Sequence, residues 1–240
     1  AEQKPIQPKE IKKPVLGYIS IIIDDWGYGE NVKEFIETID MPVAIAVLPK
    51  LPFSKMIAEC AAKNHKEVML HLPMEPNYNT DKYPKDYIVK TSMRSDKVKK
   101  IINDALATVP HVQGVNNHMG SKATENKEFM KTILTYLNEK NFFFVDSYVT
   151  EKSICKDVAN NIKIPFIKRD VFIDNVADRN MMEGEFVKLA HLAEKNGHAV
   201  GIGHARPLSL QVIKEQMRIL KDKGFVFLTV REMIERTKNK

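Results

Sequence analysis

Short apolar runs rich in β-branched residues alternate with amphipathic stretches along most of the chain. The runs predict strands at residues 18–23, 43–47, 67–70, 114–116, 142–145, 171–173, 199–202 and 225–228. The amphipathic stretches predict helices at 31–39, 53–62, 95–109, 126–138, 153–160, 183–195 and 208–221. The periodicity is clearest in the last of these, which places Leu210, Ile213, Met217 and Leu220 on one face. This alternation predicts an α/β fold with helices outside a parallel sheet.

The number of strand–helix units distinguishes two arrangements of such a sheet. Seven or eight units favour a closed or nearly closed barrel over an open doubly wound sheet. The chain has neither G-x-G-x-x-G after its first strand nor G-x-x-x-x-G-K-[ST] anywhere, and both absences argue against nucleotide binding. We therefore expect a single barrel domain over residues 17–240.

The first residues have a different composition. The stretch AEQKPIQPKEIKKP is rich in Pro and charge and nearly free of apolar side chains. Because such a segment cannot repay the entropy of ordering, residues 1–16 are predicted to form a flexible leader. The sequence begins with Ala rather than Met, which is typical of a chain whose signal peptide has been removed. We expect a secreted, periplasmic or cell-envelope protein.

Charge and hydropathy narrow the range of partners. Lys and Arg number 37 against 31 Asp and Glu, so the net charge is +6 at pH 7. The positive residues are dispersed and not interleaved with aromatic ones, so we expect no nucleic-acid partner. Attraction to an anionic cell wall is compatible with this charge. No apolar run reaches 18 residues, so no membrane span is expected. Cys60 and Cys155 are interpreted as buried free thiols, with a disulfide between them as the alternative.

Polar side chains gather where the predicted strands end. They are Asp24 and Asp25, His71 and Glu75, Asn116 to His118, Asp146, Asp174, and His204 with Arg206. In parallel α/β barrels the catalytic loops converge at the carboxyl ends of the strands. We therefore expect these side chains to surround one site.

The adjacent carboxylates of Asp24 and Asp25 indicate a bound cation. Two neighbouring negative charges repel each other, and a cation between them offsets this repulsion. Neighbouring strand residues point to opposite sides, so we expect one carboxylate to bind a metal and the other to act separately. Helix capping is the alternative role for either residue. With one Asp, His71 and His118 would complete a three-ligand site of the catalytic zinc type, although each histidine alone could be structural.

Two further features surround this predicted centre. His204 lies in GHARP, where flanking Gly and Pro fix the backbone, and suits proton transfer near neutral pH. Arg206 could orient a carboxylate partner, and no G-x-S-x-G elbow indicates a serine hydrolase. Residues 77–94 carry three Tyr in a long loop after His71, and form either the rim of a substrate groove or a plain surface excursion.

The segments IIIDDWG, HLPMEP, NNHMGS, FFVDS and GHARP together resemble the divergent branch of the polysaccharide deacetylases, over residues 17–236. The resemblance implies an irregular (β/α)7 barrel and a metal-dependent enzyme that removes acetyl groups from cell-wall glycans. It also implies that Asp24 is the general base, Asp25 a metal ligand and His204 the general acid.

The chain departs from the family pattern at one ligand. The family's second motif normally holds two histidines four residues apart, both on the metal, whereas this chain has His71 and Glu75. We expect His118 to supply the missing imidazole, with Glu75 as the competing ligand. Carboxylate and imidazole ligands suit Zn²⁺, and Co²⁺, Ni²⁺ or Mn²⁺ would also fit. The remaining polar residues at the strand ends, Asp146, Asp174 and Arg206, are expected to be further ligands or to support the ligands.

Two alternatives follow from the altered motif and from the fold. The first is a catalytically impaired barrel that keeps the metal and has a glycan-binding or cell-envelope role. The second is another metal hydrolase on the same barrel, such as an amidase or a phosphodiesterase. If the protein is a polysaccharide deacetylase, its expected partner is a polysaccharide substrate.

Overall fold

The computed structural model describes residues 14–29, 33–84 and 86–238. Its strands, in chain order, are β1 (Gly17–Trp26), β2 (Ala44–Val47), β3 (Glu67–Met74), β4 (Gly114–Met119), β5 (Phe143–Asp146), β6 (Phe166–Lys168), β7 (Val171–Phe172), β8 (His198–His204) and β9 (Phe225–Phe227). Its helices are α1 (Lys33–Thr38), α2 (Ser54–Lys63), α3 (Ser95–Leu106), α4 (Ser121–Thr124), α5 (Lys127–Glu139), α6 (Cys155–Ile162), α7 (Arg179–Asn196), α8 (Pro207–Lys223) and α9 (Val230–Lys238). The predicted alternation of strands and helices is confirmed.

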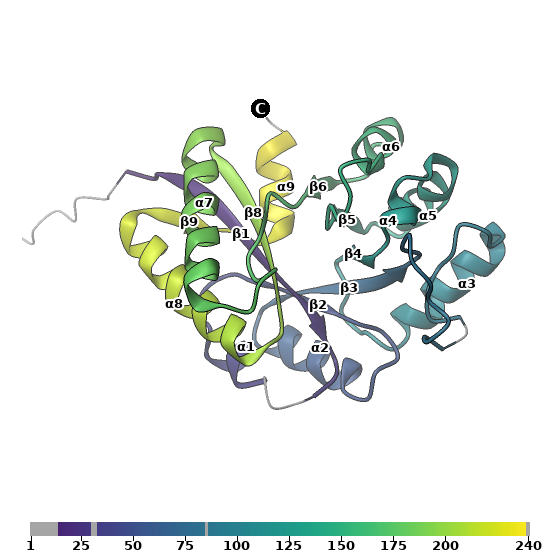
Figure 1. Cartoon of the computed structure of the whole chain (residues 1–240), viewed down its shortest axis with the longest axis horizontal. Helices are drawn as coiled ribbons and strands as arrows, with labels where there is room; N and C mark the ends of the chain where they lie inside the picture. The colour runs from purple at the N-terminus through teal and green to yellow at the C-terminus, as the bar shows by residue number, and fades with distance from the viewer. Residues whose placement is uncertain (1–13, 30–32, 85, 239–240) are drawn as a thin grey trace, which may run out of the picture.

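The strands form one curled parallel sheet with helices around it (Figure 1). Its order is β6-β5-β4-β3-β2-β1-β8-β7, and β9 pairs with β1 off this path. Every paired strand runs parallel to its neighbour. The strands β6 and β7 stand at opposite ends of this order and do not pair with each other. The curled sheet is therefore a barrel that stays open between these two strands. The expected irregular (β/α)7-type barrel in a single domain is confirmed.

The strand β1 has a continuous run of apolar residues because both of its faces are buried. Ile21 and Ile23 pack into the cluster beneath the helices, whereas Ile22 packs into a second cluster with Ala44 and Met69. A strand buried on both faces needs apolar side chains at successive positions. The second cluster lies inside the curl of the sheet.

Helix α9 covers the amino-terminal end of this interior. Val230, Met233 and Ile234 from α9 belong to the interior cluster. The Glu67 carboxylate at the start of β3 accepts hydrogen bonds from the backbone N–H groups of Val230 (2.7 Å) and Arg231 (3.1 Å). With that end of the barrel covered by α9, the polar residues at the carboxyl ends of the strands face the other end.

Several boundaries differ from the sequence-based expectations, each for a local reason. The helix expected at 183–195 begins at Arg179, because the Asp178 side chain caps it by accepting from the Met181 N–H at 2.9 Å. The three-residue β6 and the terminal α9 were not predicted, since neither gives a long periodic pattern. Cys60 and Cys155 are buried free thiols, so the disulfide alternative is wrong.

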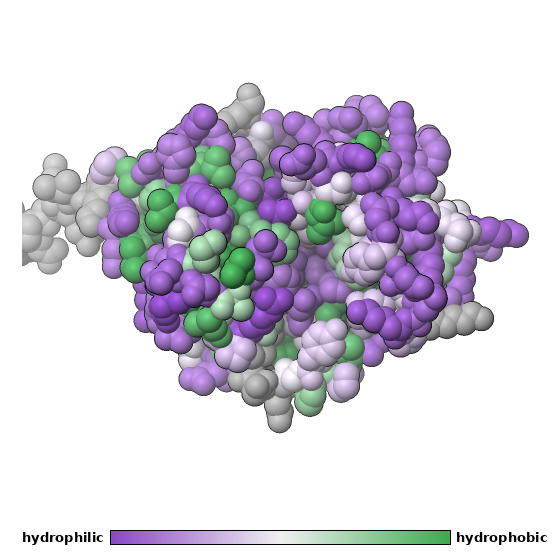
Figure 2. All heavy atoms as spheres, in the orientation of Figure 1, coloured by the Kyte–Doolittle hydropathy of each residue, from purple (hydrophilic) through white to green (hydrophobic). Residues whose placement is uncertain are grey.

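Two expectations concern the chain ends and the surface. Residues 1–13 and residues 31–32 of the first expected helix lie outside the described residues, so the leader stays a prediction. No described helix is both long enough and apolar enough to cross a membrane. The face drawn in Figure 2 is mostly hydrophilic, apart from apolar side chains gathered over α7 and α8. Val187 of α7 is 70% exposed.

Candidate functional site

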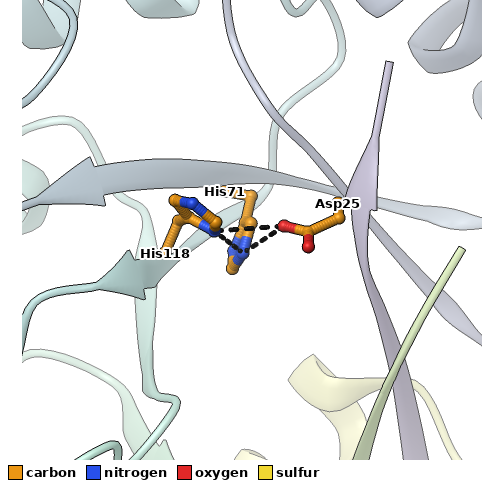
Figure 3. A group of neighbouring side chains, drawn as sticks. All are labelled: Asp25, His71 and His118. Atoms are coloured by element: carbon orange, nitrogen blue, oxygen red, sulfur yellow. Dashed lines mark hydrogen bonds and ion pairs between the residues drawn. The ribbon is translucent and has the colours of Figure 1, made fainter. Parts of the chain in front are cut away.

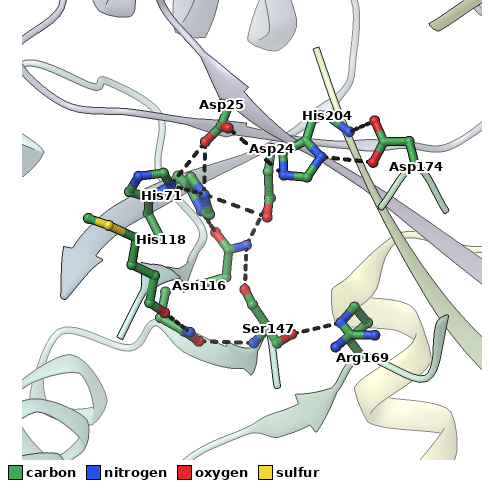
Figure 4. Close-up of polar contacts among 11 residues, drawn as sticks. Asp24, Asp25, His71, Asn116, His118, Ser147, Arg169, Asp174 and His204 are labelled. Carbon is green, nitrogen blue, oxygen red and sulfur yellow. Dashed lines mark hydrogen bonds and ion pairs between the residues drawn. The ribbon is translucent and has the colours of Figure 1, made fainter. Parts of the chain in front are cut away.

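Four strands bring the predicted site residues together at their carboxyl ends (Figure 4). In the register of the sheet, His71 on β3 lies beside Asn116 on β4, and Asp24 on β1 lies beside His204 on β8. Parallel pairing aligns these strand ends, so residues up to 180 positions apart in sequence become neighbours.

A bulge in β1 directs both adjacent carboxylates into the site. The pairing of β1 with β2 shifts between Ile23 and Trp26, and Asp25 has a φ of 64°. His71 Nε2 therefore lies 3.6 Å from Asp24 Oδ2 and 3.3 Å from Asp25 Oδ1. The expectation that the two carboxylates point to opposite sides was wrong, because a left-handed residue breaks strand alternation. Asp tolerates this conformation better than most residues, at a cost of order 1 kcal/mol.

Asp25, His71 and His118 form a triangle of ligand atoms (Figure 3). Asp25 Oδ1 lies 3.1 Å from His118 Nδ1 and 3.3 Å from His71 Nε2, and the two ring nitrogens are 3.2 Å apart. Metal–ligand bonds of about 2.0–2.1 Å in a tetrahedron place ligand atoms about 3.3 Å apart. Asp25 Oδ1 is also buried without a well-formed hydrogen bond. The residues present therefore fit a tetrahedral metal ion, with the fourth position open.

Asn116 connects His71 to Asp24. Its Oδ1 accepts a hydrogen bond from His71 Nδ1 at 2.9 Å, so that His71 Nε2 faces Asp25 and His118. Its Nδ2 donates to Asp24 Oδ1 at 2.9 Å and to Ser147 Oγ at 3.2 Å. The single amide thus sets both the orientation of an imidazole and the position of a carboxylate.

Burial and charge act in opposite directions on these groups. Burial alone would lower the pKa of His71, but the Asp24 and Asp25 carboxylates outweigh it and raise that pKa to about 9. Burial would raise the pKa of Asp25, but His118 and His71 hold it well below its usual range. For Asp24, burial prevails and raises the pKa, although the two imidazoles of His71 and His204 oppose it. Positive charge placed between the two carboxylates would favour the ionised form of both.

His204 is held by a carboxylate on the opposite side of the site. Its Nδ1 lies 2.8 Å from Asp174 Oδ1, and its backbone N–H donates to Asp174 Oδ2 at 3.0 Å. Ser209 Oγ donates to the same Oδ2 at 2.5 Å, and the Phe172 ring stacks on the imidazole with centroids 5.3 Å apart. Burial would lower the pKa of His204, but Asp174 outweighs burial and raises it. This pairing leaves Nε2 toward Asp25 Oδ2, at 3.9 Å.

The structure does not bring three other expected residues into the cluster. The Glu75 carboxylate is bound by Thr91 and Lys122. The Asp146 carboxylate accepts from the Tyr148 N–H and from Ser153 Oγ, and so holds the turn after β5. Arg206 Nη1 reaches the backbone oxygen of Asp174 at 3.5 Å rather than a carboxylate.

Sequence reasoning missed a supporting layer beneath His204. Arg169 donates to the backbone oxygens of Ser147 and Tyr148, at 2.7 Å each, and its guanidinium lies 4.6 Å from the centre of the Phe172 ring. Phe172 then stacks on His204. Arg169 lies between Lys168 and Asp170, where a single sequence gives no sign that it differs from a surface charge.

The sequence comparisons identify relatives over nearly the whole barrel. Residues 21–234 match the profile of the family described as divergent polysaccharide deacetylase. The chain is 32% identical over 209 residues to the uncharacterized protein YibQ of Escherichia coli, covering 86% of this chain and 65% of that protein. It is 31% identical over 206 residues to an uncharacterized protein of Haemophilus influenzae, covering 85% of this chain and 72% of that one. The chain thus spans just under two thirds of the length of YibQ.

Solved structures show the same fold at lower identity. An uncharacterized protein of Agrobacterium tumefaciens has a TM-score of 0.83 at 17% identity, over 90% of this chain and 89% of that one. A variant of the peptidoglycan deacetylase PdaC of Bacillus subtilis has a TM-score of 0.57 at 13% identity, over 93% of each chain. A CE4 family pseudoenzyme from Bacillus anthracis has a TM-score of 0.54 at 11% identity, over 91% and 65%. With its profile match and its relatives above 30% identity, the chain belongs to the divergent polysaccharide deacetylase family.

Proposed function

We propose that the protein is a metal-dependent hydrolase that removes acetyl groups from a polysaccharide of the cell envelope. The observation that carries this proposal is the triangle of Asp25, His71 and His118, whose spacing matches a tetrahedral metal site. Asp24 and His204 flank the triangle, so a proton acceptor and a proton donor adjoin the open ligand position.

The chemistry divides between the metal and the side chains. A divalent ion, zinc by the preference of its ligands, would supply Lewis acidity and lower the pKa of a bound water. Asp24 is held by Asn116 through Oδ1, and its Oδ2, 3.6 Å from His71 Nε2, would accept the proton of the attacking water. His204 Nε2 then donates a proton to the departing amine or alkoxide, while Asp174 stabilises the charged imidazole.

The catalytically impaired alternative rests on one observation, the replacement of the family's second motif histidine by Glu75. A relative by fold is itself a pseudoenzyme. Against this alternative, the ligand number is made up by His118, and the His204–Asp174 pair is complete. A barrel kept only for binding has no need of both an acceptor and a donor beside the metal. The enzyme is therefore the function that we propose.

The proposed location follows from the substrate. Polysaccharides carrying acetyl groups lie outside the cytoplasm, so we expect the protein to act in the cell envelope or beyond it. The net charge of +6 would favour an anionic wall. Fractionation of cells that express the protein from its own gene tests this location.

Acetate release by the zinc-loaded protein tests the activity. The substrates are N-acetylated chito-oligosaccharides, peptidoglycan fragments and an O-acetylated xylan, with a phosphodiester and a peptide amide for the other hydrolase classes. We expect acetate from at least one glycan, and its loss in Asp25→Ala and His204→Ala. Turnover of the phosphodiester or the peptide alone would favour the other hydrolase classes. Zinc binding without turnover of any substrate would favour the impaired barrel.

A further inference from the structure

The inner face of the barrel changes from apolar to polar within two residues on several strands. An apolar residue of the interior cluster is followed two positions later by a site residue, in the pairs Ile22 and Asp24, Met69 and His71, Val145 and Ser147, and Ile202 and His204. Alternate side chains of a strand share a face, so each pair points into the barrel. Ile167 of β6 belongs to the same cluster, and Arg169 follows it by two positions. This alternation places Arg169 in the layer of the site residues.

Two sets of contacts fix Arg169 in the wall of the site, and Figure 4 shows it at the opposite end of the residue cluster from the metal triangle. Arg169 Nε donates to the Ser147 backbone oxygen at 2.7 Å, and the Ser147 hydroxyl accepts from the Asn116 amide at 3.2 Å. The guanidinium also lies 4.6 Å from the centre of the Phe172 ring, which stacks on the His204 imidazole. The side chain is therefore held between the end of β5 and the proposed proton donor.

The Arg169 guanidinium forms no ion pair with any carboxylate in the part of the chain that the structure describes. Its hydrogen bonds go to the backbone oxygens of Ser147 and Tyr148, and Nη1 has no partner among the described residues. The carboxylates of Asp146 and Asp170 already accept hydrogen bonds from other groups. Burial lowers the pKa of Arg169, although these two carboxylates oppose it. A half-buried guanidinium with unused N–H groups is thus available to an anion that enters the site.

We propose that Arg169 binds a carboxylate of the substrate, and that the substrate is an acetylated glycan with acidic sugar units. The proposal rests on the deacetylase function proposed above and narrows its substrate class. A guanidinium donates parallel N–H groups to both oxygens of a carboxylate, and a neutral sugar offers no equivalent acceptor. The carboxylate of an acidic sugar lies either on an ether-linked side chain or at C6 of a uronic acid, and both positions offer the same group.

Matched acidic and neutral sugars test the proposal in the unaltered protein. The zinc-loaded protein is titrated by calorimetry with N-acetylmuramic acid and the primary amide of its lactyl group, and with an O-acetylated galacturonic acid trimer and its methyl ester. Acetate is followed in the same samples. We expect the acid of at least one pair to bind about tenfold more tightly than its neutral partner, and that pair identifies the position of the carboxylate. Equal affinities within both pairs, or no binding of either acid, overturn the proposal.

Variants at two adjacent positions separate a specific contact from net charge. Arg169→Gln should weaken binding of the preferred acid about tenfold and leave its neutral partner within about twofold. Lys168→Gln is the matched control, because it removes the same charge from the preceding residue, whose Nζ lies over the Tyr148 ring at 4.1 Å. It should keep the preference for the acid. Arg169→Lys keeps the charge without the planar fork, so it should lower the preference by about threefold only.

The outcomes also distinguish this role from a structural one and from the activity. If Arg169 only holds the turn after β5, Arg169→Gln and Arg169→Lys weaken the acid and the neutral sugar equally, and the proposal is wrong. Equal effects of Arg169→Gln and Lys168→Gln overturn it as well. Should Arg169→Gln fail to fold, Arg169→Lys decides, and an unchanged preference then refutes the contact. Absence of acetate with binding of the acid that depends on Arg169 overturns the deacetylase function and keeps the carboxylate site.

Discussion

Replacing Asn116 by Ala removes one buried amide that makes three contacts in the site. Asn116 is 0% exposed, accepts from His71 Nδ1 at 2.9 Å, and donates to Asp24 Oδ1 at 2.9 Å and Ser147 Oγ at 3.2 Å. Without it, His71 loses the partner that keeps Nε2 toward the metal position. Asp24 loses the N–H donor that binds its Oδ1 and so keeps its Oδ2 directed toward the proposed substrate position.

The contacts give the size of two separate effects. Loss of a partner that orients a metal ligand lowers metal affinity about 10–100-fold, or about 1.4–2.8 kcal/mol. Each buried polar group left without a partner costs about 1–3 kcal/mol of folding free energy. With the His71 N–H and the Asp24 oxygen both unpaired, we expect Asn116→Ala to lower the free energy of unfolding by about 3 kcal/mol.

Asn116→Asp is the matched variant. A carboxylate keeps the acceptor for His71 Nδ1, so zinc affinity should stay within about threefold of the unaltered protein. When ionised it cannot donate to Asp24, and its negative charge beside Asp24 raises the pKa of the proposed base, so kcat should fall about 100-fold. Zinc affinity is measured by competition with a chelator, stability by urea unfolding of the metal-free protein, and kcat by acetate release. If folded Asn116→Ala binds zinc within about twofold of the unaltered protein, the proposed orienting role of Asn116 is wrong.

Three further predictions concern the general acid, the helix α9 and the packing of β4. Asp174→Asn should lower kcat about 100-fold in acetate release with unchanged zinc affinity, and an unchanged kcat would exclude the proposed His204 pair. Burial raises the pKa of Glu67 to about 7 despite two backbone donors, so the folded state holds its proton more tightly than the unfolded chain. Its contribution to stability is present below about pH 4.5 and lost as pH rises through 7, by about 3 kcal/mol, and Glu67→Gln should flatten urea unfolding across this window. Gly114→Ala should cost about 1–3 kcal/mol in thermal unfolding, because its Cβ would lie 2.1 Å from the Phe143 ring, whereas Gly184→Ala, with open space in α7, should be neutral or stabilising.

The strand-end positions of the site residues could be predicted from the sequence because parallel pairing determines them. An apolar run followed at once by Asp24, or by His71, marks the carboxyl end of a strand, and every such end lies on the same side of the sheet. The structure accordingly brings Asp24, Asp25, His71, His118 and His204 into one cluster.

Features that depend on a single backbone angle or on a contact between distant residues could not be predicted in this way. The bulge at Asp25 depends on one φ of 64°, and nothing in the letters DD distinguishes it from regular strand. The support of His204 by Phe172 and Arg169 depends on β7 lying beside β8 at the end of the sheet. That neighbourhood follows from the curl of the whole sheet.

Glu75 and His118 have different partners in the structure, and this difference connects the proposed metal site to the loop beside it. Position 75 follows the end of β3, where its backbone pairs with Val89 and its side chain turns toward Thr91 and Lys122. A side chain so placed cannot also contribute to the triangle of Asp25, His71 and His118, because its oxygens already have partners. His118 on the neighbouring strand β4 reaches the triangle directly, with Nδ1 at 3.2 Å from His71 Nε2. In the proposed site, His118 on β4 supplies the third ligand atom, and the Glu75 side chain holds the tyrosine-bearing loop instead.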